Sequence, residues 1–274
     1  MPTFEYSDML ARVAGNMATY AAFRKSHSGQ AGIPKYQINP KSRSAEIISR
    51  ASTRGRISLL EPEAYEVCDE YGISVPPFRV VESIQSAIAS ANEIGYPIAL
   101  KVVSEEILHK TDAGGVMLGI ASDSALKGSY KQLAANVKKT APNLSKIRVL
   151  VQKMIPSNTE LVLGALRDKS FGPVVMFGMG GIYVEALKIV GFRLSPICLD
   201  DAKKLIHETL PPALIKGVRG RGPMNVDSIA GVLVSLGRLL EEQPQIKEVD
   251  FNPVLPYQDG CIAVDARIVI SRSR

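Results

Sequence analysis

From residue 56 onward, the chain is a succession of short segments in which apolar residues recur at either helical or strand spacing. Between residues 62 and 71 they fall on one helical face, and a glycine follows the end of the segment. Further helices are predicted between Ser83 and Gly95 and at residues 124–140, 201–210 and 227–240. Strands are predicted at residues 78–81, 98–103, 116–121, 147–153, 161–166, 173–177, 248–251 and 261–265. Because the two element types mix without a regular βαβα rhythm, the pattern predicts an α+β fold with substantial antiparallel sheet.

The first 56 residues differ from the rest in charge and in punctuation. They carry nine Lys or Arg against three Asp or Glu, whereas residues 57–274 carry 24 of each kind. Helical stretches near residues 10–23 and 45–51 flank a segment rich in Gly, Ser and Pro. We therefore expect residues 1–56 to be a basic N-terminal extension or linker. The balanced charge of the main part, without an aromatic stacking pattern, argues against nucleic-acid binding.

Size and composition indicate a chain with a large apolar core. It has 274 residues, 46% of them hydrophobic, yet its apolar runs are far shorter than the roughly 20 residues that a membrane-spanning helix needs. The three cysteines, Cys68, Cys198 and Cys261, are widely spaced and form no CxxC pattern. We therefore expect neither a disulfide framework nor a zinc site, no membrane partner, and a cytoplasmic location.

One cation, Lys101, lies within the apolar strand predicted at residues 98–103. A lysine in such a strand needs a partner that offsets its desolvation. That partner is either a structural carboxylate or a nucleotide phosphate, and spacing alone does not decide between the two.

Two glycine-containing loops follow predicted strands. The first runs from His109 to Gly115 with the sequence HKTDAGG, and the second, GMGG, spans Gly178 to Gly181. Paired glycines let a backbone approach a ligand closely, although they also form ordinary turns. Neutral imidazole is a competent nucleophile near pH 7, so His109 is a candidate nucleophile. The second loop has neither the Walker nor the dinucleotide-binding spacing.

Acidic and amide side chains alternate near the C-terminus. Strand periodicity turns Glu248, Asp250 and Asn252 to one face, and Asp265 follows on a neighbouring strand. These hard oxygen atoms suit magnesium held jointly by protein and phosphate, although acidic residues also alternate on ordinary exposed strands.

Together these segments resemble the ATP-grasp part of ADP-forming acetyl-CoA and other acyl-CoA synthetases. The resemblance rests on residues 96–116, 149–197, 248–256 and 263–268, in that order, and covers roughly residues 57–270. It implies two α+β lobes that clasp a nucleotide. The small lobe, with a phosphohistidine loop, would span residues 57–146, and the large lobe, with the nucleotide and magnesium site, residues 147–274.

The same resemblance implies roles for individual residues. Residues expected to contact the nucleotide are Lys101 at the phosphates, Gln152, Lys153 and Met154 in a hinge beside adenine, Glu160 near the ribose, and Gly180 and Gly181 near the phosphates. Residues expected to carry the chemistry are His109 as the transient phosphohistidine, Asn252 and Asp265 as magnesium ligands, and Asp250 and Glu185 beside the transferred group. Lys153 departs from the acidic residue often found at that hinge position, which puts the base preference in question.

The implied reaction converts acyl-CoA, phosphate and ADP reversibly into the free acid, CoA and ATP. This chain would catalyse the nucleotide step with Mg²⁺ and ATP or ADP. Because it has no evident CoA-binding GxGxxG segment, we expect a CoA-ligase subunit or fused domain as partner, in a hetero-oligomer. Alternatives are another acid–thiol ligase, such as one for succinyl-CoA or malate-CoA, or a non-catalytic nucleotide sensor. The acyl group, the ATP or GTP preference and the physiological direction stay open.

Overall fold

The computed structural model describes residues 7–27, 39, 41–107, 110–142, 144, 146–156, 159–181, 189–217 and 222–272. The chain divides into two compact units, Met1–Lys35 and Tyr36–Arg274. The first unit contains helix α1 (Ser7–His27), whose described side chains are mostly exposed. The other described helices and strands belong to the second unit. Among them is α2 (Arg43–Thr53), which buries Ile47, Ile48 and Ala51. Part of the sequence expected to be an extension is therefore packed in the main unit.

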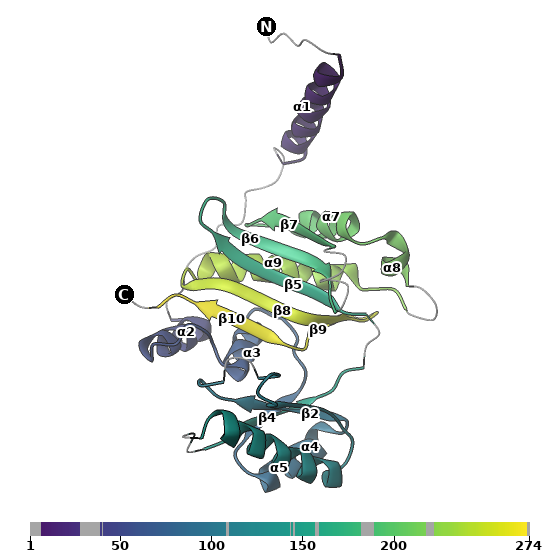
Figure 1. Ribbon diagram of the computed structural model, residues 1–274. Helices are drawn as coiled ribbons and strands as arrows, with labels where there is room; N and C mark the ends of the chain where they lie inside the picture. Colours follow the sequence, from purple (N-terminus) through teal and green to yellow (C-terminus); the bar gives the residue numbers. More distant parts are fainter. Residues whose placement is uncertain are drawn as a thin grey trace. The chain divides into compact units, whose positions relative to one another are not determined.

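A four-stranded antiparallel sheet forms the smaller layer of the second unit. Its strand order is β1-β4-β2-β3, with β1 at Phe78–Val81, β4 at Arg148–Lys153, β2 at Ile98–Val103 and β3 at Val116–Ile120. Helices α4 (Ile84–Ile94) and α5 (Asp123–Thr140) pack on one face (Figure 1). Ser83 and Ser122 cap them by accepting backbone N–H groups. Strand β4, from the C-terminal half of the chain, thus completes the smaller sheet.

Both faces of the central strand β2 are covered. Its six residues are all buried, and Ile98, Leu100 and Val102 pack in the core with α4 and α5. Because side chains alternate along a strand, Lys101 and Val103 lie on the opposite face. Lys101 is therefore directed away from the α4–α5 layer.

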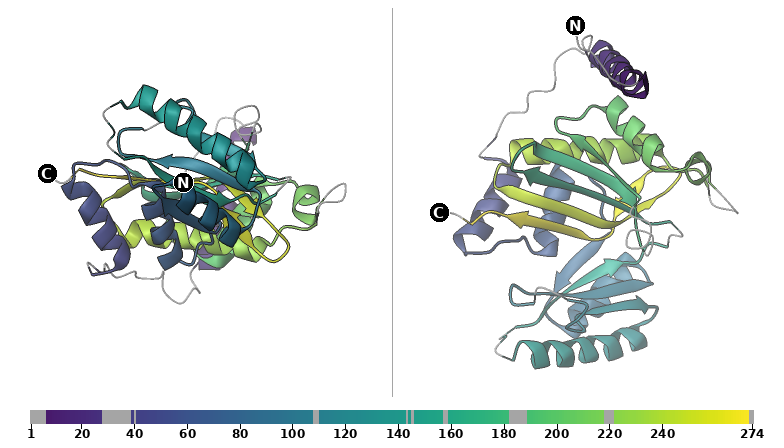
Figure 2. Two further views of the ribbon diagram at one scale, coloured as in Figure 1. Left: turned by 90° about the horizontal axis from the view of Figure 1, so that it is seen from below. Right: turned by 45° about the horizontal axis from the view of Figure 1, so that its top comes forward.

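The larger antiparallel sheet has the strand order β10-β8-β5-β6-β7, and β9 pairs with β8. Its strands are β5 (Leu161–Asp168), β6 (Gly172–Met179), β7 (Val190–Leu194), β8 (Ile246–Pro256), β9 (Cys261–Ala263) and β10 (Ala266–Ile270). Helices α7 (Leu199–Thr209) and α9 (Val226–Glu242) cover one face, with the short α8 (Pro212–Lys216) between them in sequence (Figures 1 and 2). The burial of Leu233, Leu236 and Leu240 ties α9 to this sheet.

Helix α3 (Glu61–Glu70) contacts both sheets. The Tyr65 hydroxyl lies 2.6 Å from the Val264 carbonyl oxygen, between β9 and β10. The Tyr65 ring also packs against Phe78 of β1, with 5.0 Å between the ring centroids. Just before the helix, the Leu59 N–H donates to Ile268 of β10. The N-terminal turn of α3 is therefore held where the two sheets meet.

The α+β prediction is confirmed, since every described strand pairing is antiparallel. Strands β7 and β10 and helix α8 were not predicted. The strand expected at residues 261–265 ends at Ala263, and pairing with β8 resumes only at Ala266. No helix in the described ranges is both long and apolar enough to cross a bilayer.

Candidate active site

The buried amine of Lys101 is surrounded by oxygen atoms from other elements. Lys101 is 6% exposed, and its Nζ lies 2.5 Å from Glu61 Oε1 and 3.3 Å from the Val264 carbonyl oxygen. Asp265 Oδ2 lies 4.0 Å away. These contacts offset the cost of burying the ammonium group, which would otherwise be several kcal/mol or more. The structural carboxylate considered for Lys101 is therefore present, and it is Glu61.

Glu61 also binds a second lysine. Its side chain is 2% exposed, and its Oε2 forms an ion pair with Lys110 Nζ. Burial opposes ionisation of Glu61, but the positive charges of Lys101 and Lys110 outweigh it and lower the pKa of this carboxyl group. The Tyr65 hydroxyl, one helical turn away, lies 2.6 Å from Glu61 Oε1. Glu61 is thus an ionised bridge between two cations.

Sequence reasoning did not identify Glu61. One signal was available, because an acidic residue in the first turn of a helix is favoured by the helix dipole. That signal places Glu61 at a helix start but gives no indication that β2 packs against it.

His109 and Leu108 lie outside the described residues, whereas both of their flanks are described. Ile107 is 5% exposed and belongs to the core of the smaller sheet. On the other side, the Lys110 carbonyl oxygen accepts a hydrogen bond of 2.7 Å from the Gly115 N–H. The expected phosphohistidine is therefore flanked by two residues that the fold holds in place.

The paired glycines of this loop pack closely against the protein. A Cβ added to Gly115 would lie 2.5 Å from Val102 Cγ1, and one on Gly114 would lie 2.5 Å from Asn136 Nδ2. Gly114 also has a positive φ of 62°, and Asn136 donates to its carbonyl oxygen. Two roles are open for these glycines from the sequence, a close approach to a ligand and an ordinary turn. In the structure, they seat a turn against β2 and α5.

Gln152, the first residue of the expected hinge, lies in the Lys101 network. It is 1% exposed, and its Nε2 is 2.8 Å from the Tyr65 hydroxyl and 3.1 Å from the Val264 carbonyl oxygen. Its Oε1 is buried without a hydrogen-bond partner among the described residues. Lys101, Tyr65 and Gln152 therefore converge on one carbonyl group, that of Val264.

The next two hinge residues are tied to the segment before β2. Lys153 Nζ donates to the carbonyl oxygens of Gly95 and Tyr96, at 2.9 and 2.7 Å. The backbone N–H of Lys153 donates to Pro77, and that of Met154 donates to Pro97. The backbone N–H groups of Lys153 and Met154 are thus engaged within the protein.

The expected metal ligands lie opposite one another at the interruption between β9 and β10. Phe251 pairs with Ala266 and Val254 pairs with Ala263, so residues 252–253 face residues 264–265. The Val264 N–H donates to the Pro253 carbonyl oxygen at 3.0 Å. The ladder thus brings Asn252 and Asp265 to one place.

The local charges affect the two aspartates of this region. The Asp265 side chain is about half exposed, so its desolvation is partial. This desolvation and the Glu61 charge raise its pKa, and Lys101 opposes the rise. The pKa of Asp250 is raised by burial and by Glu248, although Arg267 faces Asp250 across the ladder and opposes the rise. A nearby divalent cation would favour the ionised form of both carboxyl groups.

This region offers one amide and one carboxylate for a hard divalent cation. Within the described ranges, no group of three or more His, Cys, Asp or Glu could hold a metal ion. The oxygen donors Asn252 and Asp265 nevertheless suit magnesium, which keeps waters and substrate phosphates in its coordination sphere.

The second glycine loop meets Glu160. The Gly180 N–H donates to the Glu160 carbonyl oxygen at 2.7 Å, and a Cβ on Gly180 would lie 2.9 Å from the Glu160 carbonyl carbon. Gly181 has a φ of 62°, and a Cβ there would lie 2.8 Å from Glu160 Oε2. Glu185, four residues further on, lies outside the described residues. These contacts bring Glu160, Gly180 and Gly181 together at the ends of β5 and β6.

The strand ladder connects this group to the metal region. Leu161, next to Glu160, pairs with Val254, two residues from Asn252. The Glu160 glycine loop and the expected metal ligands therefore lie toward the same end of the β5–β8 pair.

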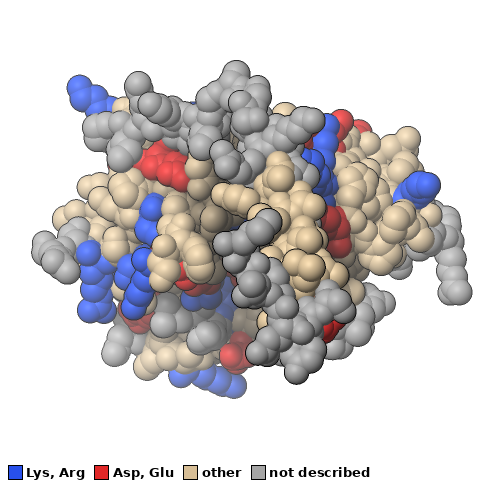
Figure 3. All heavy atoms as spheres, turned by 90° about the horizontal axis from the view of Figure 1, so that it is seen from above, with Lys and Arg blue, Asp and Glu red and all other residues tan. Residues whose placement is uncertain are grey.

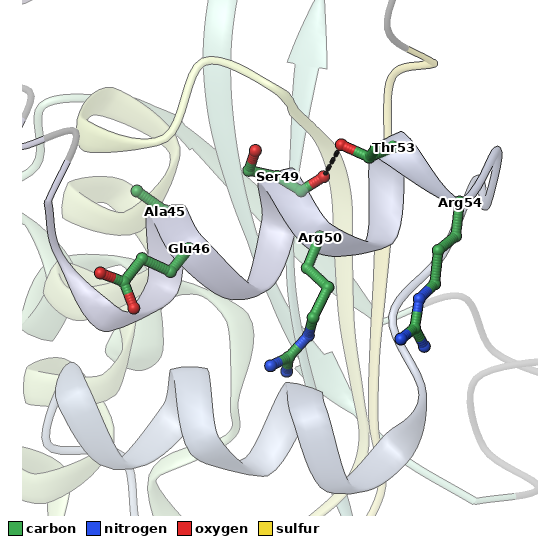
Figure 4. Close-up of a pocket in the computed structure, with 6 residues that line it drawn as sticks. All are labelled: Ala45, Glu46, Ser49, Arg50, Thr53 and Arg54. Carbon is green, nitrogen blue, oxygen red and sulfur yellow. Dashed lines mark hydrogen bonds between the residues drawn. The ribbon is translucent and has the colours of Figure 1, made fainter.

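A surface hollow elsewhere among the described residues is lined by α2 and its C-cap residue, with Ala45, Glu46, Ser49, Arg50, Thr53 and Arg54 (Figure 4). Its Thr53 hydroxyl bonds the Ser49 carbonyl oxygen of the same helix. On the face shown in Figure 3, acidic and basic side chains are interspersed among the described residues. Neither feature resembles an extended basic groove.

Comparison with known proteins shows the family of this chain. The family model of the ATP-grasp domain matches residues 50–270, and the chain belongs to the ATP-grasp family. It is similar to the β subunit of ADP-forming acetate–CoA ligase I from Pyrococcus furiosus, with 42% identity over 225 residues, 82% of this chain and 97% of that one. It is also similar to the ADP-forming 4-hydroxybutyrate–CoA ligase of Nitrosopumilus maritimus. That identity is 34% over 270 residues, which cover 98% of this chain but 38% of the longer protein.

Solved structures agree. The acetyl-coenzyme A synthetase 1 of Ca. Korarchaeum cryptofilum, in complex with coenzyme A and Ca-AMPCP, matches with a TM-score of 0.79 and 39% identity. A second structure of that protein, with Mg-AMPPCP and a phosphohistidine segment pointing towards its nucleotide site, matches with a TM-score of 0.73 and 37% identity. Each match covers 83% of this chain and 100% of that one. The predicted ATP-grasp fold and the resemblance to ADP-forming acid–thiol ligases are confirmed.

Proposed function

We propose that this chain binds Mg²⁺ with ATP or ADP and moves a phosphoryl group between the nucleotide and His109, within an ADP-forming acyl-CoA synthetase. The observation that supports this most directly is the shared carboxylate of Glu61. Lys110, which follows His109, and Lys101, the expected phosphate ligand, bind the two oxygens of one side chain. The loop that carries the nucleophile is thereby tied to the lysine expected to hold the nucleotide phosphates.

In the direction that consumes ATP, an unprotonated imidazole nitrogen of His109 attacks the γ-phosphorus. A nitrogen–phosphorus bond forms, the bond to the β,γ-bridging oxygen breaks, and ADP leaves with that electron pair. The reverse transfer makes ATP from phosphohistidine and ADP. Phosphoryl transfer depends mainly on alignment and on stabilisation of the negative charge, which the Lys101 ammonium group supplies in a buried setting.

Asn252 and Asp265 would hold the magnesium ion, which neutralises phosphate oxygens when it is bound. Their oxygen atoms and their opposed positions support this assignment. Asp250 and Glu185 would lie beside the transferred group. Gly180 and Gly181, packed against Glu160, would let the backbone approach the phosphates and the ribose.

We place the nucleotide base beside the hinge of Gln152, Lys153 and Met154. Because the N–H groups of Lys153 and Met154 are already engaged, carbonyl oxygens of this segment would supply its backbone contacts to the base. An acceptor carbonyl favours a base edge that carries an amino group, as adenine does at N6.

The acyl and CoA chemistry requires a partner under this proposal. One relative is named as a β subunit, and the other is a longer ligase of which the match covers 38%. Both a separate CoA-ligase subunit and a fused domain are therefore compatible with this proposal. We propose that the chain functions in the cytoplasm within such a hetero-oligomer or fused protein.

The test is incubation of the chain with γ-labelled ATP and magnesium, followed by mapping of the modified residue. We expect an acid-labile label on His109 and none in His109→Asn, which should still bind nucleotide. Labelling that persists in His109→Asn would exclude His109 as the acceptor. Tight nucleotide binding without any label, alone or with a CoA-ligase partner, would indicate a nucleotide sensor instead.

A further inference from the structure

We propose that Glu61 is a positioning residue for phosphoryl transfer: it bridges Lys101 and Lys110 and thereby fixes the segment that carries His109 relative to the nucleotide. This inference rests on the proposed role of His109. It assigns to Glu61 a task beyond neutralising one buried lysine.

The backbone of Glu61 is held in place at the start of α3. The following residue, Pro62, restricts the backbone of the first helical turn. Glu63 accepts two hydrogen bonds from Arg56, at 2.6 and 2.9 Å, and a third from the Leu60 N–H. With its side chain 2% exposed, the Glu61 carboxylate has little freedom to leave the two lysines.

The other end of the bridge is held as firmly. The turn that begins at Lys110 is closed by the Gly115 N–H and is seated on Val102 and Asn136 through its two glycines. Only residues 108 and 109 separate the buried Ile107 from Lys110. Because consecutive Cα atoms lie about 3.8 Å apart, that stretch spans at most roughly 11 Å. The bridge therefore holds Lys110, the described residue that directly follows His109.

The charges explain why a carboxylate is needed here. Without Glu61, two ammonium groups would lie close together, one of them buried, with Asp265 at 4.0 Å as the carboxylate near Lys101. Like charges in a buried setting repel strongly, so Lys110 would leave and release the loop. A residue that served Lys101 alone would make the Lys110 side chain dispensable, and this difference provides a test.

The first experiment measures phosphoenzyme formation in single turnovers at saturating Mg-ATP, together with the Kd for Mg-ATP. We expect Lys110→Met to lower the rate about 10- to 100-fold while changing the Kd less than about threefold, because alignment rather than binding is lost. Glu61→Gln should lower the rate at least as much. The double variant should be no slower than Glu61→Gln within about threefold, because both changes remove the same contact.

Lys127→Met, an exposed lysine substitution on α5, is the matched control and should behave as wild type. Multiplied effects in the double variant, or a normal rate in Lys110→Met, would overturn the proposal. Should Glu61→Gln fail to fold, Lys110→Met decides alone, since Lys110 is 25% exposed.

The second experiment needs no activity. Amide hydrogen exchange over residues 107–116 should quicken about tenfold or more at Gly114 and Gly115 in Lys110→Met, and stay unchanged in Lys127→Met. Unchanged exchange in Lys110→Met would refute the bridge. If wild type forms no phosphohistidine, the proposed function fails, and this exchange measurement still tests the bridge on its own.

Discussion

Glu61 and Lys110 are 49 residues apart in sequence, yet they form an ion pair beside the buried amine of Lys101. The first turn of α3 therefore contacts both the strand that presents Lys101 and the loop that presents His109. Glu61 therefore joins the expected phosphate ligand Lys101 to the His109 loop by direct contacts that involve no residue of the larger sheet.

Lys101→Met should weaken Mg-ATP binding. A hydrogen bond to a charged group contributes about 1.5–3 kcal/mol, which corresponds to roughly a 10- to 150-fold change in Kd. Isothermal titration calorimetry on this variant, with Lys127→Met as the matched control, measures the loss. An unchanged Kd would mean that Lys101 serves only the ion pair with Glu61.

Asp265→Asn should raise the magnesium concentration needed for half-maximal phosphoenzyme formation, by about tenfold or more. The amide keeps one oxygen donor but loses the negative charge that attracts the ion. Asp259→Asn, in the exposed turn between β8 and β9, is the control and should leave the magnesium requirement as in wild type. If the two variants needed the same magnesium concentration, Asp265 would not be a magnesium ligand.

Gly115→Ala should destabilise the smaller sheet by about 1–3 kcal/mol, because its Cβ would lie 2.5 Å from Val102 Cγ1. Gly128→Ala is the control. Gly128 lies in α5 with no heavy atom within 4 Å of an added Cβ, so alanine there should stabilise the protein by about 0.5–1 kcal/mol. Thermal unfolding midpoints measure both changes. A Gly115→Ala protein as stable as wild type would contradict the close packing of the loop.

Acid should remove the stabilising contribution of Glu63. Burial raises the pKa of this group, but the hydrogen bonds from Arg56 and the Leu60 N–H outweigh burial, so the pKa in the folded chain is lowered. The contribution is therefore complete above the unfolded value of about 4.3 and is lost as the pH falls through the lower folded value.

We expect Glu63→Gln to be less stable than wild type near neutral pH and to approach it as the pH falls well below about 4.3. Glu93→Gln is the comparison, because its ion pair with Arg79 is exposed on both sides and should contribute little at any pH. Urea unfolding at several pH values measures the difference. A gap between Glu63→Gln and wild type that widened in acid would reverse the sign of this argument.

Much of the fold could be predicted from periodicity, because most strands and helices have one apolar face and clear end signals. Strand β7 does alternate, with Val190, Phe192 and Leu194 on one face, but it has only five residues and none of them is buried. The break between β9 and β10 depends on how Val264 and Asp265 meet β8. That break is a tertiary property, which local sequence patterns do not predict.

The candidate site shows the same division. A buried lysine at position 101 implied a partner, and both a carboxylate and a phosphate were considered. Glu61 could not be selected from the sequence, because the pairing requires α3 to pack against β2. The loop glycines were predicted to matter, but their contacts with Val102 and Asn136 arise only in the folded chain. Residues 109 and 185, both given catalytic roles, lie outside the described part, so those roles stay predictions.

The carbonyl oxygen of Val264 accepts from Lys101 and Gln152 of the smaller sheet and lies within hydrogen-bonding distance of Tyr65 on α3. Because both of these donors lie on the smaller sheet and Val264 lies between β9 and β10 of the larger one, a single oxygen atom ties the two sheets together. Any separation of the sheets would break both hydrogen bonds at once and would leave the buried Lys101 amine without one of its acceptors.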